Sequence, residues 1–168
     1  MYDLLIKGGT VVDPAQGING INDVAVTDGK VARVAPNIGA EEAIQVVEVR
    51  GKIVTPGLID LHVHVYHRHV PISLEPDALC PAGGVTTMLD AGSAGSENFG
   101  GFRHDILDRA ETQLFALVNL SCMGLIVAHF GELMDRRYAD PEGVVETIRR
   151  HPDVALGVKI RAGRHIIG

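Results

Sequence analysis

The feature that most constrains the fold is an alternation of apolar and helical segments after residue 56. Short apolar runs occupy residues 58–63, 85–89, 114–120 and 155–160, and segments with helical patterns lie at 75–82, 99–110 and 140–150. The last of these opens with Asp140-Pro141-Glu142, in which an N-cap aspartate precedes a proline at the first helical position. Strands that are apolar throughout and alternate with helices predict a parallel sheet covered by helices on at least one face.

The first fifty residues predict a small β unit instead. Two β-rich runs flank Asp28-Gly29, a strong hairpin signal, because glycine adopts positive φ without a Cβ clash. Further short strands are expected at 3–7 and 10–12, and a second hairpin is expected about Arg50-Gly51, from runs at 46–49 and 52–54. We therefore expect a β segment at 1–54 and a strand–helix region at 55–168.

Composition excludes several classes of partner. The net charge is −6 without any basic run, so neither nucleic acid nor an anionic membrane is expected to bind. The apolar stretches are far shorter than the ~18 residues of a membrane span, and the N-terminal MYDLLIKGGT lacks the pattern of a signal peptide. The two cysteines, Cys80 and Cys122, lie far apart in apolar surroundings, which indicates a reducing, cytoplasmic setting.

A cluster of histidines follows the first apolar run of the strand–helix region. His62 and His64 share one face of that predicted strand, because side chains alternate along a strand. They lie at its carboxyl end, where parallel α/β sheets place their functional sites. Two imidazoles on one face can bind one metal ion. The alternative is a structural or accidental pair. The adjacent His67 and His69 are expected in a loop, beside Pro71.

A lysine in the fourth apolar run is the second unusual residue. Lys159 lies in Gly157-Val158-Lys159-Ile160, where an ammonium group is costly to bury. The ordinary interpretation is that its stem reaches solvent or that it pairs with an acid. The other interpretation is that a neutral amine takes up carbon dioxide to give a carbamate, whose two oxygens can bridge two metal ions. Lys159, His62 and His64 would then all lie at strand ends and face one site.

Three stretches together carry a resemblance to a known family. IVTPGLIDLHVHV, AGGVTTMLDAGSAG and GVKIRAG resemble the amidohydrolase superfamily of metal-dependent hydrolases. Within it, DAGSAGSENFGGFR and RYADPEGVVETIRRHPDVALGVKIR are similar to the amidohydrolase/deacetylase branch, the relatives of dihydroorotase and of N-acyl amino-acid deacetylases. The resemblance covers essentially the whole chain. It implies an α/β fold, the N-terminal part of a (β/α)8 TIM barrel preceded by a small β-sandwich segment.

The resemblance also implies a binuclear metal centre. His62 and His64 would hold the more buried of two divalent ions, expected to be Zn2+, and a carboxylated Lys159 would bridge to the second. The family's further histidines, from the fifth and sixth strands, and its eighth-strand aspartate have no counterparts here. A full barrel takes about 200 residues or more. We therefore expect residues 55–168 to carry about half of a barrel, and the 168-residue chain alone to be inactive and oligomeric or poorly soluble.

The predicted function is hydrolysis of an amide or ester bond in a small-molecule substrate, most simply an N-acyl amino acid, by an enzyme that is a homo-oligomer. A dihydroorotase or hydantoinase is the nearest alternative. It is disfavoured because Val65-Tyr66 follow His64, and Arg68 is shifted from the position at which dihydroorotases bind the substrate carboxylate. Arg103 is a candidate carboxylate binder, with a solvated helix arginine as the alternative. A non-catalytic barrel relative that serves as an assembly subunit is the alternative from another class.

Overall fold

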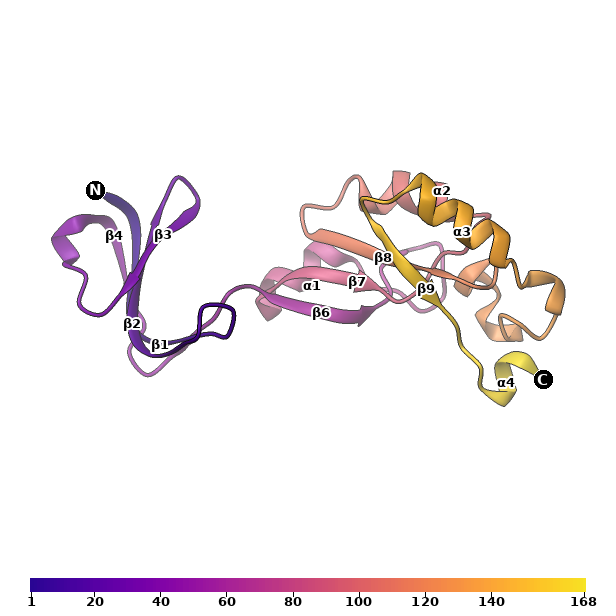
Figure 1. The fold of residues 1–168 in the computed structure, drawn as a ribbon, viewed down its shortest axis with the longest axis horizontal. Coiled ribbons are helices and arrows are strands. Elements are labelled where there is room, and N and C mark those ends of the chain that lie inside the picture. The colour runs from indigo at the N-terminus through magenta and orange to yellow at the C-terminus, as the bar shows by residue number, and fades with distance from the viewer. The chain divides into compact units, whose positions relative to one another are not determined.

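The computed structural model describes the backbone of residues 1–168 and every side chain except that of Pro81. The chain forms two compact units, Met1–Pro56 and Gly57–Gly168. The first unit is a β-sheet and the second contains a sheet with helices (Figure 1). None of the helices in the described chain is both long and apolar enough to cross a membrane.

The first unit is one five-stranded sheet. Its central path runs β3-β2-β1-β4, and β5 pairs with the far end of β1. A hairpin joins β2 to β3 through Asp28 and Gly29, whose φ values of 51° and 69° confirm the predicted turn. The strands are β1 (Tyr2–Asp13), β2 (Ile18–Thr27), β3 (Lys30–Ala35), β4 (Ala43–Glu48) and β5 (Ile53–Val54).

Two predictions about this sheet are wrong. The segments at 3–7 and 10–12 form one continuous strand, β1, with a register shift between Ile6 and Gly9 that Gly8 accommodates at φ 76°. The hairpin about Arg50-Gly51 does not form, because β4 and β5 both pair in parallel with β1 rather than with each other. The turn at Gly51 therefore links two neighbours of one long strand.

The second unit has four parallel strands in the order β6-β7-β8-β9. This confirms the predicted alternation and the parallel sheet. The helix expected at 99–110 is shorter, because a single α-turn continues as a π-helical segment at Arg103–Leu107. The main elements are β6 (Leu58–Val63), α1 (Pro76–Gly83), β7 (Val85–Asp90), α2 (Phe99–Phe102), β8 (Gln113–Asn119), α3 (Pro141–Arg150), β9 (Ala155–Lys159) and α4 (Arg164–Ile167).

Helices α1, α2 and α3 share one hydrophobic core with the sheet. Strand residues such as Met88 and Val118 belong to the same buried cluster as Cys80 of α1, Phe102 of α2 and Val144 of α3. Alternate residues of β8 are buried in this cluster, so the helices pack on one face of the sheet. Asp140 caps α3 as predicted, and its carboxylate accepts a hydrogen bond from the Gly143 backbone N–H at 3.0 Å.

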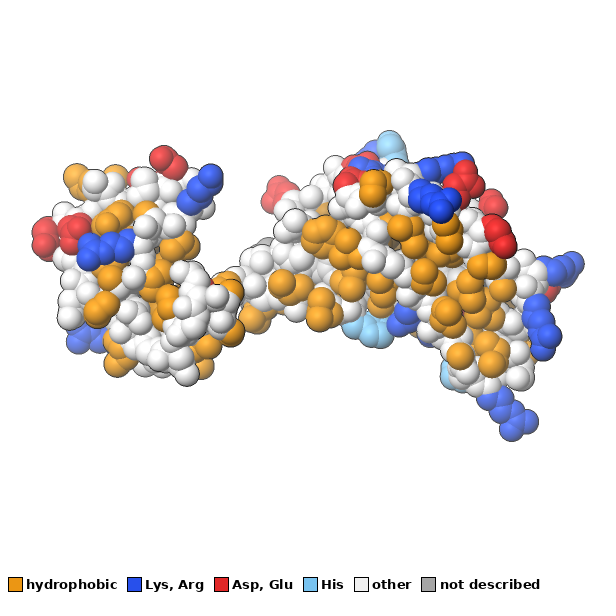
Figure 2. Space-filling model, in the orientation of Figure 1, with side chains coloured by type: hydrophobic (Ala, Val, Ile, Leu, Met, Phe, Trp, Pro, Cys, Tyr) orange, Lys and Arg blue, Asp and Glu red, His pale blue; other side chains and the backbone are white. Residues whose placement is uncertain are grey.

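The two outer strands of this sheet are the exception to the predicted burial. The sequence predicts a buried first strand, yet Leu61 is 68% exposed. Edge strands lack a neighbour on one side, so side chains that a further strand or helix could cover stay accessible. Figure 2 shows apolar side chains on the surface over both edge strands. The exposed residues are Leu58, Ile59 and Leu61 on β6, with Leu156, Val158 and Ile160 on or just after β9.

Candidate functional site

His62 and His64 lie at the carboxyl end of β6. His62 is the last residue but one of the strand, and His64 follows the strand directly. Their ring centroids are 5.6 Å apart, with the ring planes nearly perpendicular at 85°. Both line a hollow of about 380 Å³, together with Asp60 and Ser73. The structure thus brings the predicted pair together, and metal binding by that pair stays a prediction.

The surroundings of His64 keep its imidazole neutral. Burial lowers the pKa of His64 from 6.5 to about 4, and the positive charges of His62, Lys159 and Arg161 act in the same direction, while Glu132 opposes them. A neutral ring has one nitrogen lone pair available. Its Nδ1 atom lies 3.0 Å from Ser93 Oγ, so a hydrogen bond to the serine engages one of the two ring nitrogens.

Lys159 is the last residue of β9, so it lies at the same carboxyl end of the sheet as His62 and His64. It is half-buried and pairs in register with Asn119 of β8. Gly92, in the loop after β7, lies against its stem, since a Cβ atom added there would come within 2.5 Å of Lys159 Cβ. Among the described residues no carboxylate forms an ion pair with Lys159. Of the two ordinary interpretations, pairing with an acid is therefore not seen, whereas a stem that reaches solvent is compatible with the partial exposure of Lys159.

These donors fit a divalent ion as part of a ligand set. Imidazole nitrogen is a preferred ligand of zinc, and two such rings lie side by side here. In the described part of the chain, no group of three or more His, Cys, Asp and Glu side chains is arranged to hold a metal. His62 and His64 can thus supply two ligands. Further ligands would have to come from another type of group, such as a lysine carbamate, or from other residues.

Arg103 lies on the helical side of the sheet and already binds carboxylates. Its two terminal nitrogens each donate to Asp153 at 2.7 Å, and its Nε lies 3.2 Å from Asp108. Its Nη1 also lies 3.3 Å from Nδ1 of His151. The planar fork of the guanidinium is therefore occupied by this chain's own acids. A role for Arg103 in binding substrate stays a prediction.

Of the remaining histidines, His67 and His69 lie where the sequence places them. His67 and His69 are in the loop after β6, and the ring of His69 stacks on Tyr66 with centroids 4.4 Å apart. His151 ends α3 half-buried, with its ring centroid 5.2 Å from that of Phe99.

Sequence reasoning missed four polar residues near the strand ends. Asp90 and Ser93 are both 0% exposed, and they contact the segment that carries His64. Glu132 is 1% exposed, and its Oε2 accepts a hydrogen bond from Arg161 at 2.7 Å. Its Oε1 and the Nε of Arg161 are buried without a partner in the described structure. Two features of the sequence could have indicated these residues: Asp90 at the end of an apolar run, and Arg161 two residues after Lys159.

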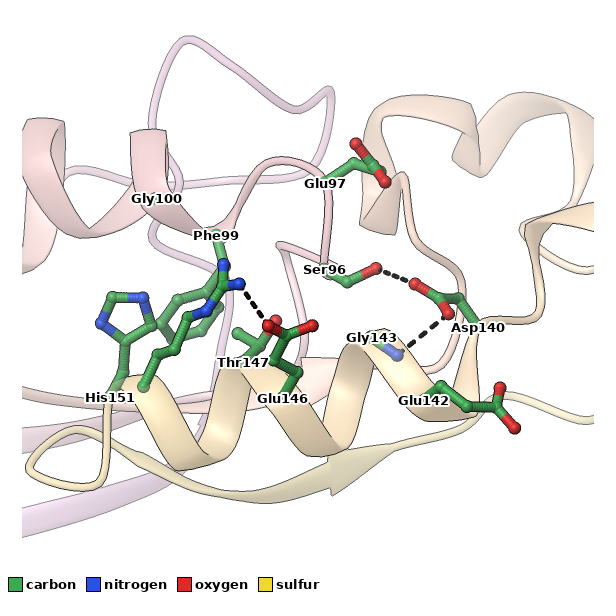
Figure 3. Close-up of a pocket in the computed structure, with 11 residues that line it drawn as sticks. Ser96, Glu97, Phe99, Gly100, Asp140, Glu142, Gly143, Glu146, Thr147 and His151 are labelled. Atoms are coloured by element: carbon green, nitrogen blue, oxygen red, sulfur yellow. Dashed lines mark hydrogen bonds and ion pairs between the residues drawn. The ribbon is translucent and has the colours of Figure 1, made fainter.

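A larger hollow, of about 650 Å³, lies between α2 and α3 (Figure 3). None of His62, His64 and Lys159 lines it. Asp140 lines this hollow, and its carboxylate accepts hydrogen bonds from the Ser96 hydroxyl at 2.5 Å and from the Gly143 backbone N–H. Glu146 pairs with Arg150 along the helix. These groups satisfy one another, so we interpret this hollow as a helix–helix groove rather than the functional site.

Two curated deacetylases match most of the chain but only part of their own length. A deacetylase of Agrobacterium fabrum is 36% identical over 142 residues, which are 84% of this chain and 35% of the relative. A deacetylase of Enterococcus faecalis is 35% identical over 168 residues, 99% of this chain and 43% of the relative. A dihydroorotase of Citrifermentans bemidjiense is 49% identical, but over 63 residues only. No family model matches the chain.

Solved structures share the fold of the whole chain. A crystal structure of an adenine deaminase has a TM-score of 0.81 and 35% identity, and the match covers 100% of this chain and 44% of that one. A crystal structure of a dihydroorotase has a TM-score of 0.83 and 31% identity, with 100% and 45% covered. The chain thus spans less than half the length of each of these proteins.

Proposed function

Because the chain belongs to the amidohydrolase superfamily, we propose that the full-length protein is a metal-dependent hydrolase that cleaves an amide bond. The four parallel strands of its second unit are the N-terminal part of a (β/α)8 barrel. Residues 1–54 would be one part of a composite β domain. The observation that carries the proposal is the pair of adjacent imidazoles, one held neutral, at the carboxyl end of β6.

In this proposal His62 and His64 bind a divalent metal, most simply zinc, through ring nitrogens. Lys159 would first lose a proton from its ammonium group to water, and the amine would then add to carbon dioxide: a C–N bond forms, one C–O π bond breaks, and an N–H proton leaves to water. The carbamate, whose single negative charge is shared by two oxygens, would serve as a ligand for the metal ions. When bound, such ions polarise a carbonyl and allow water to ionise near neutral pH. Gly92 matters here because it leaves room for the stem of Lys159.

We further propose an N-acyl amino acid as the substrate. This choice is supported by the extent of the matches, since the deacetylases align with 84% and 99% of the chain and the curated dihydroorotase with 38%. A cyclic amidohydrolase of the dihydroorotase type is the second candidate, which the solved dihydroorotase favours by its TM-score of 0.83. Initial rates with N-acetyl amino acids and with dihydroorotate or hydantoin distinguish the two candidates. Faster turnover of the cyclic amides would reverse the assignment.

The metal assignment is tested by metal analysis of the purified full-length protein. The double variant His62→Ala, His64→Ala should lose at least one metal ion per chain. The matched control is His67→Ala, His69→Ala, which removes two imidazoles of the same spacing from the following loop and should keep the metal. Unchanged metal in the first variant, or equal loss in both, would contradict the assignment. A wild-type protein that binds no metal would instead favour a non-catalytic barrel relative.

The role of Lys159 has its own test. Lys159→Ala should abolish activity, and short carboxylic acids should restore part of it by replacing the carbamate oxygens. A crystal structure of the metal-loaded protein with an unmodified ammonium group at Lys159 would refute the carbamate.

The exposed apolar residues of β6 and β9 support the pairing of these two edges with the remaining strands and helices of the proposed barrel. We propose separately that the full-length protein is a homo-oligomer. Sedimentation of the full-length protein tests whether it is a homo-oligomer, and a monomer at micromolar concentration would exclude one.

A further inference from the structure

The ring of His64 is held by a serine that the metal proposal does not use. Ser93 is fully buried in the loop after β7, and its Oγ lies 3.0 Å from Nδ1 of His64. The loop turns back toward β6 at Gly92, which has a φ of 81° that favours glycine. A hydroxyl carries one proton and two lone pairs, so it either donates to Nδ1 or accepts from it. The direction of this one bond decides which imidazole nitrogen keeps a lone pair.

Asp90 links the two segments that meet in this contact. It is fully buried, and its Oδ1 accepts a hydrogen bond from the Ser93 backbone N–H at 2.6 Å. Its Oδ2 accepts another from the backbone N–H of Val65, the residue after His64, at 2.8 Å. One carboxylate therefore fixes both the backbone beside the histidine and the backbone of the serine that touches its ring.

The carboxylate also competes for the serine proton. Burial raises the pKa of Asp90, and hydrogen bonds from the Ser93 and Val65 backbones and from the Ser93 side chain act against that rise. The Ser93 hydroxyl contacts Nδ1 of His64, and the backbone N–H of the same serine is bound to Oδ1 of Asp90, so the rotating O–H has the imidazole nitrogen and the carboxylate as its nearest candidate acceptors. A carboxylate is the stronger acceptor, because charge-assisted hydrogen bonds are roughly twice as strong as neutral ones.

We propose that Asp90 and Ser93 are positioning residues that fix His64 as the tautomer protonated at Nδ1. The Ser93 hydroxyl donates to Asp90, and its oxygen accepts the proton of Nδ1. Nε2 then keeps its lone pair and faces away from the serine. This carboxylate–serine–histidine chain uses only groups of this chain, and it sets the ring's orientation as well as its tautomer.

The consequence for metal binding rests on the proposed function. If His64 is a metal ligand, Nε2 is the ligating atom. Its lone pair is already available in the metal-free protein, so binding requires no change of tautomer. Groups that orient a metal-binding histidine are typically worth 10–100-fold in metal affinity. The tautomer itself is a property of the metal-free protein and can be measured without any metal.

The experiment uses the full-length protein labelled with 15N-histidine, metal-free, at pH 8, where an ordinary imidazole is neutral. A long-range 1H–15N spectrum reports which ring nitrogen of each histidine carries the proton, and His64→Gln assigns the signal. Wild type should show His64 protonated at Nδ1. Ser93→Ala should give a mixture of the Nδ1-protonated and Nε2-protonated forms. Asp90→Asn should give such a mixture as well, because the amide replaces one acceptor oxygen near the serine with an NH2 donor. If Asp90→Asn does not fold, Ser93→Ala carries the test alone.

Ser73→Ala is the matched control. Ser73 lines the same hollow as His64, but its hydroxyl donates to the Val70 carbonyl at 3.1 Å, so its loss should leave the His64 signal unchanged. In a chelator competition with Zn2+, Ser93→Ala should bind about 10–100-fold more weakly than wild type and Ser73→Ala equally well. An Nε2-protonated His64 in wild type, or an unchanged tautomer in Ser93→Ala, would overturn the inference. A tautomer shift in a protein that binds no metal would leave the positioning role intact and refute the proposed function.

Discussion

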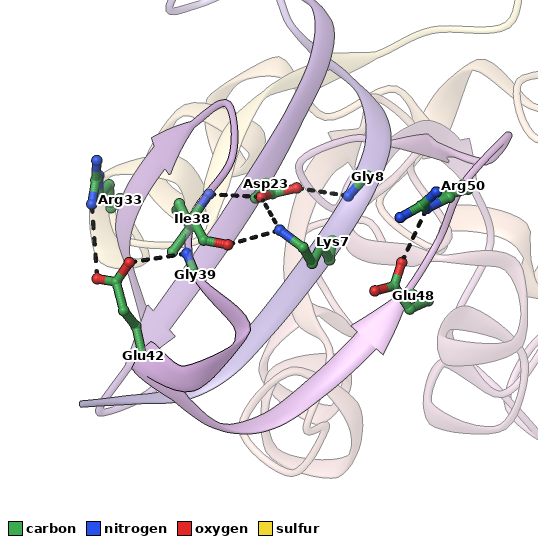
Figure 4. A network of polar contacts seen from close by, with 9 residues as sticks. All are labelled: Lys7, Gly8, Asp23, Arg33, Ile38, Gly39, Glu42, Glu48 and Arg50. Atoms are coloured by element: carbon green, nitrogen blue, oxygen red, sulfur yellow. Dashed lines mark hydrogen bonds and ion pairs between the residues drawn. The ribbon is translucent and has the colours of Figure 1, made fainter.

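Replacement of Asp23 by alanine should open the β sheet of the first unit locally. Asp23 is 3% exposed, and its carboxylate receives three hydrogen bonds (Figure 4). Oδ1 accepts from the Gly8 backbone N–H at 2.7 Å, and Oδ2 accepts from Lys7 Nζ at 2.8 Å and from the Ile38 backbone N–H at 2.9 Å. The side chain thus ties β1, β2 and the segment after β3 together.

The expected cost follows from what each donor loses. A hydrogen bond to a charged group contributes about 1.5–3 kcal/mol. Ile38 is 1% exposed, so its N–H would stay unpaired in Asp23→Ala. The Lys7 side chain is 21% exposed, so water can replace the hydrogen bond that it loses to Asp23. Its hydrogen bond to the Ile38 carbonyl, at 2.7 Å, can remain. We therefore expect a loss of about 3–5 kcal/mol, as when one partner of a buried ion pair is removed. Asp23→Asn keeps one acceptor oxygen and should cost about half as much.

Hydrogen exchange is the suitable assay, because a chain of two units need not unfold in one transition. The free energy of opening, measured at the amides of Gly8 and Ile38, should fall by the stated amount. Asp3→Ala is the matched control in the same sheet. The exposed Asp3 carboxylate accepts one hydrogen bond, from the Asp28 N–H at 2.7 Å, so its loss should cost below about 1 kcal/mol. Equal effects of the two variants would refute the reasoning.

The same network predicts a pH dependence. Burial raises the pKa of Asp23, but the hydrogen bond from Lys7 and the N–H groups of Gly8 and Ile38 outweigh it, so the pKa is lowered from 3.8. A carboxyl with a depressed folded pKa stabilises the fold above its unfolded pKa, and this contribution is lost as pH falls through the folded value. Protection at Ile38 should therefore be constant from neutral pH to about 5 and decrease below about 4. Asp23→Asn should remove that decrease.

Three further substitutions have expected costs. Phe102→Ala, at a side chain that is 0% exposed, should lower the free energy of unfolding by about 3–5 kcal/mol in urea titrations, and a loss below about 1 kcal/mol would contradict its place in the core. Asp140→Ala removes the cap of α3 and should cost about 1–2 kcal/mol, seen as faster amide exchange at Gly143, whereas unchanged exchange would contradict the cap. Arg161→Ala leaves the buried Glu132 unpaired and should lower the free energy of unfolding by about 2–3 kcal/mol. The double variant with Glu132→Gln should recover part of this loss. Strictly additive losses of the two single variants would show that the two side chains do not interact.

The sequence predicts the second unit better than the first. Apolar runs alternate there with capped or amphipathic helices, so element type follows from local pattern, and parallel pairing in chain order follows from the alternation. In the first unit, Gly8-Gly9 has the composition of a strand end but forms a register shift within β1. Likewise, Arg50-Gly51 has the composition of a hairpin turn, yet the flanking strands both pair with β1. Partner choice between distant strands depends on the tertiary structure, which local pattern does not encode.

The candidate site was likewise predictable from the sequence only in part. His62 and His64 could be found because their spacing alone places them together at a strand end. Ser93 is 29 positions from His64, and Asp90 is 25 positions from Val65, so their contacts depend on the pairing of β6 with β7 and on the turn that follows. The exposure of the edge strands was equally unpredictable from apolar runs, since burial depends on which neighbours are present.

Buried polar side chains at the carboxyl end of the sheet connect its four strands in series. Asp90 of β7 holds the backbone after β6 through Val65, and Asn119 of β8 donates to the Gly92 carbonyl after β7 at 2.9 Å. Asn119 also pairs in register with Lys159 of β9. Both polar side chains are almost fully buried, and their hydrogen bonds offset the cost of burial. These hydrogen bonds and the pairing of β8 with β9 connect the segment of His64 to that of Lys159, so the four strands set the separation of these two groups. If His64 and Lys159 are metal ligands, as proposed, any further ligands would have to fit that separation.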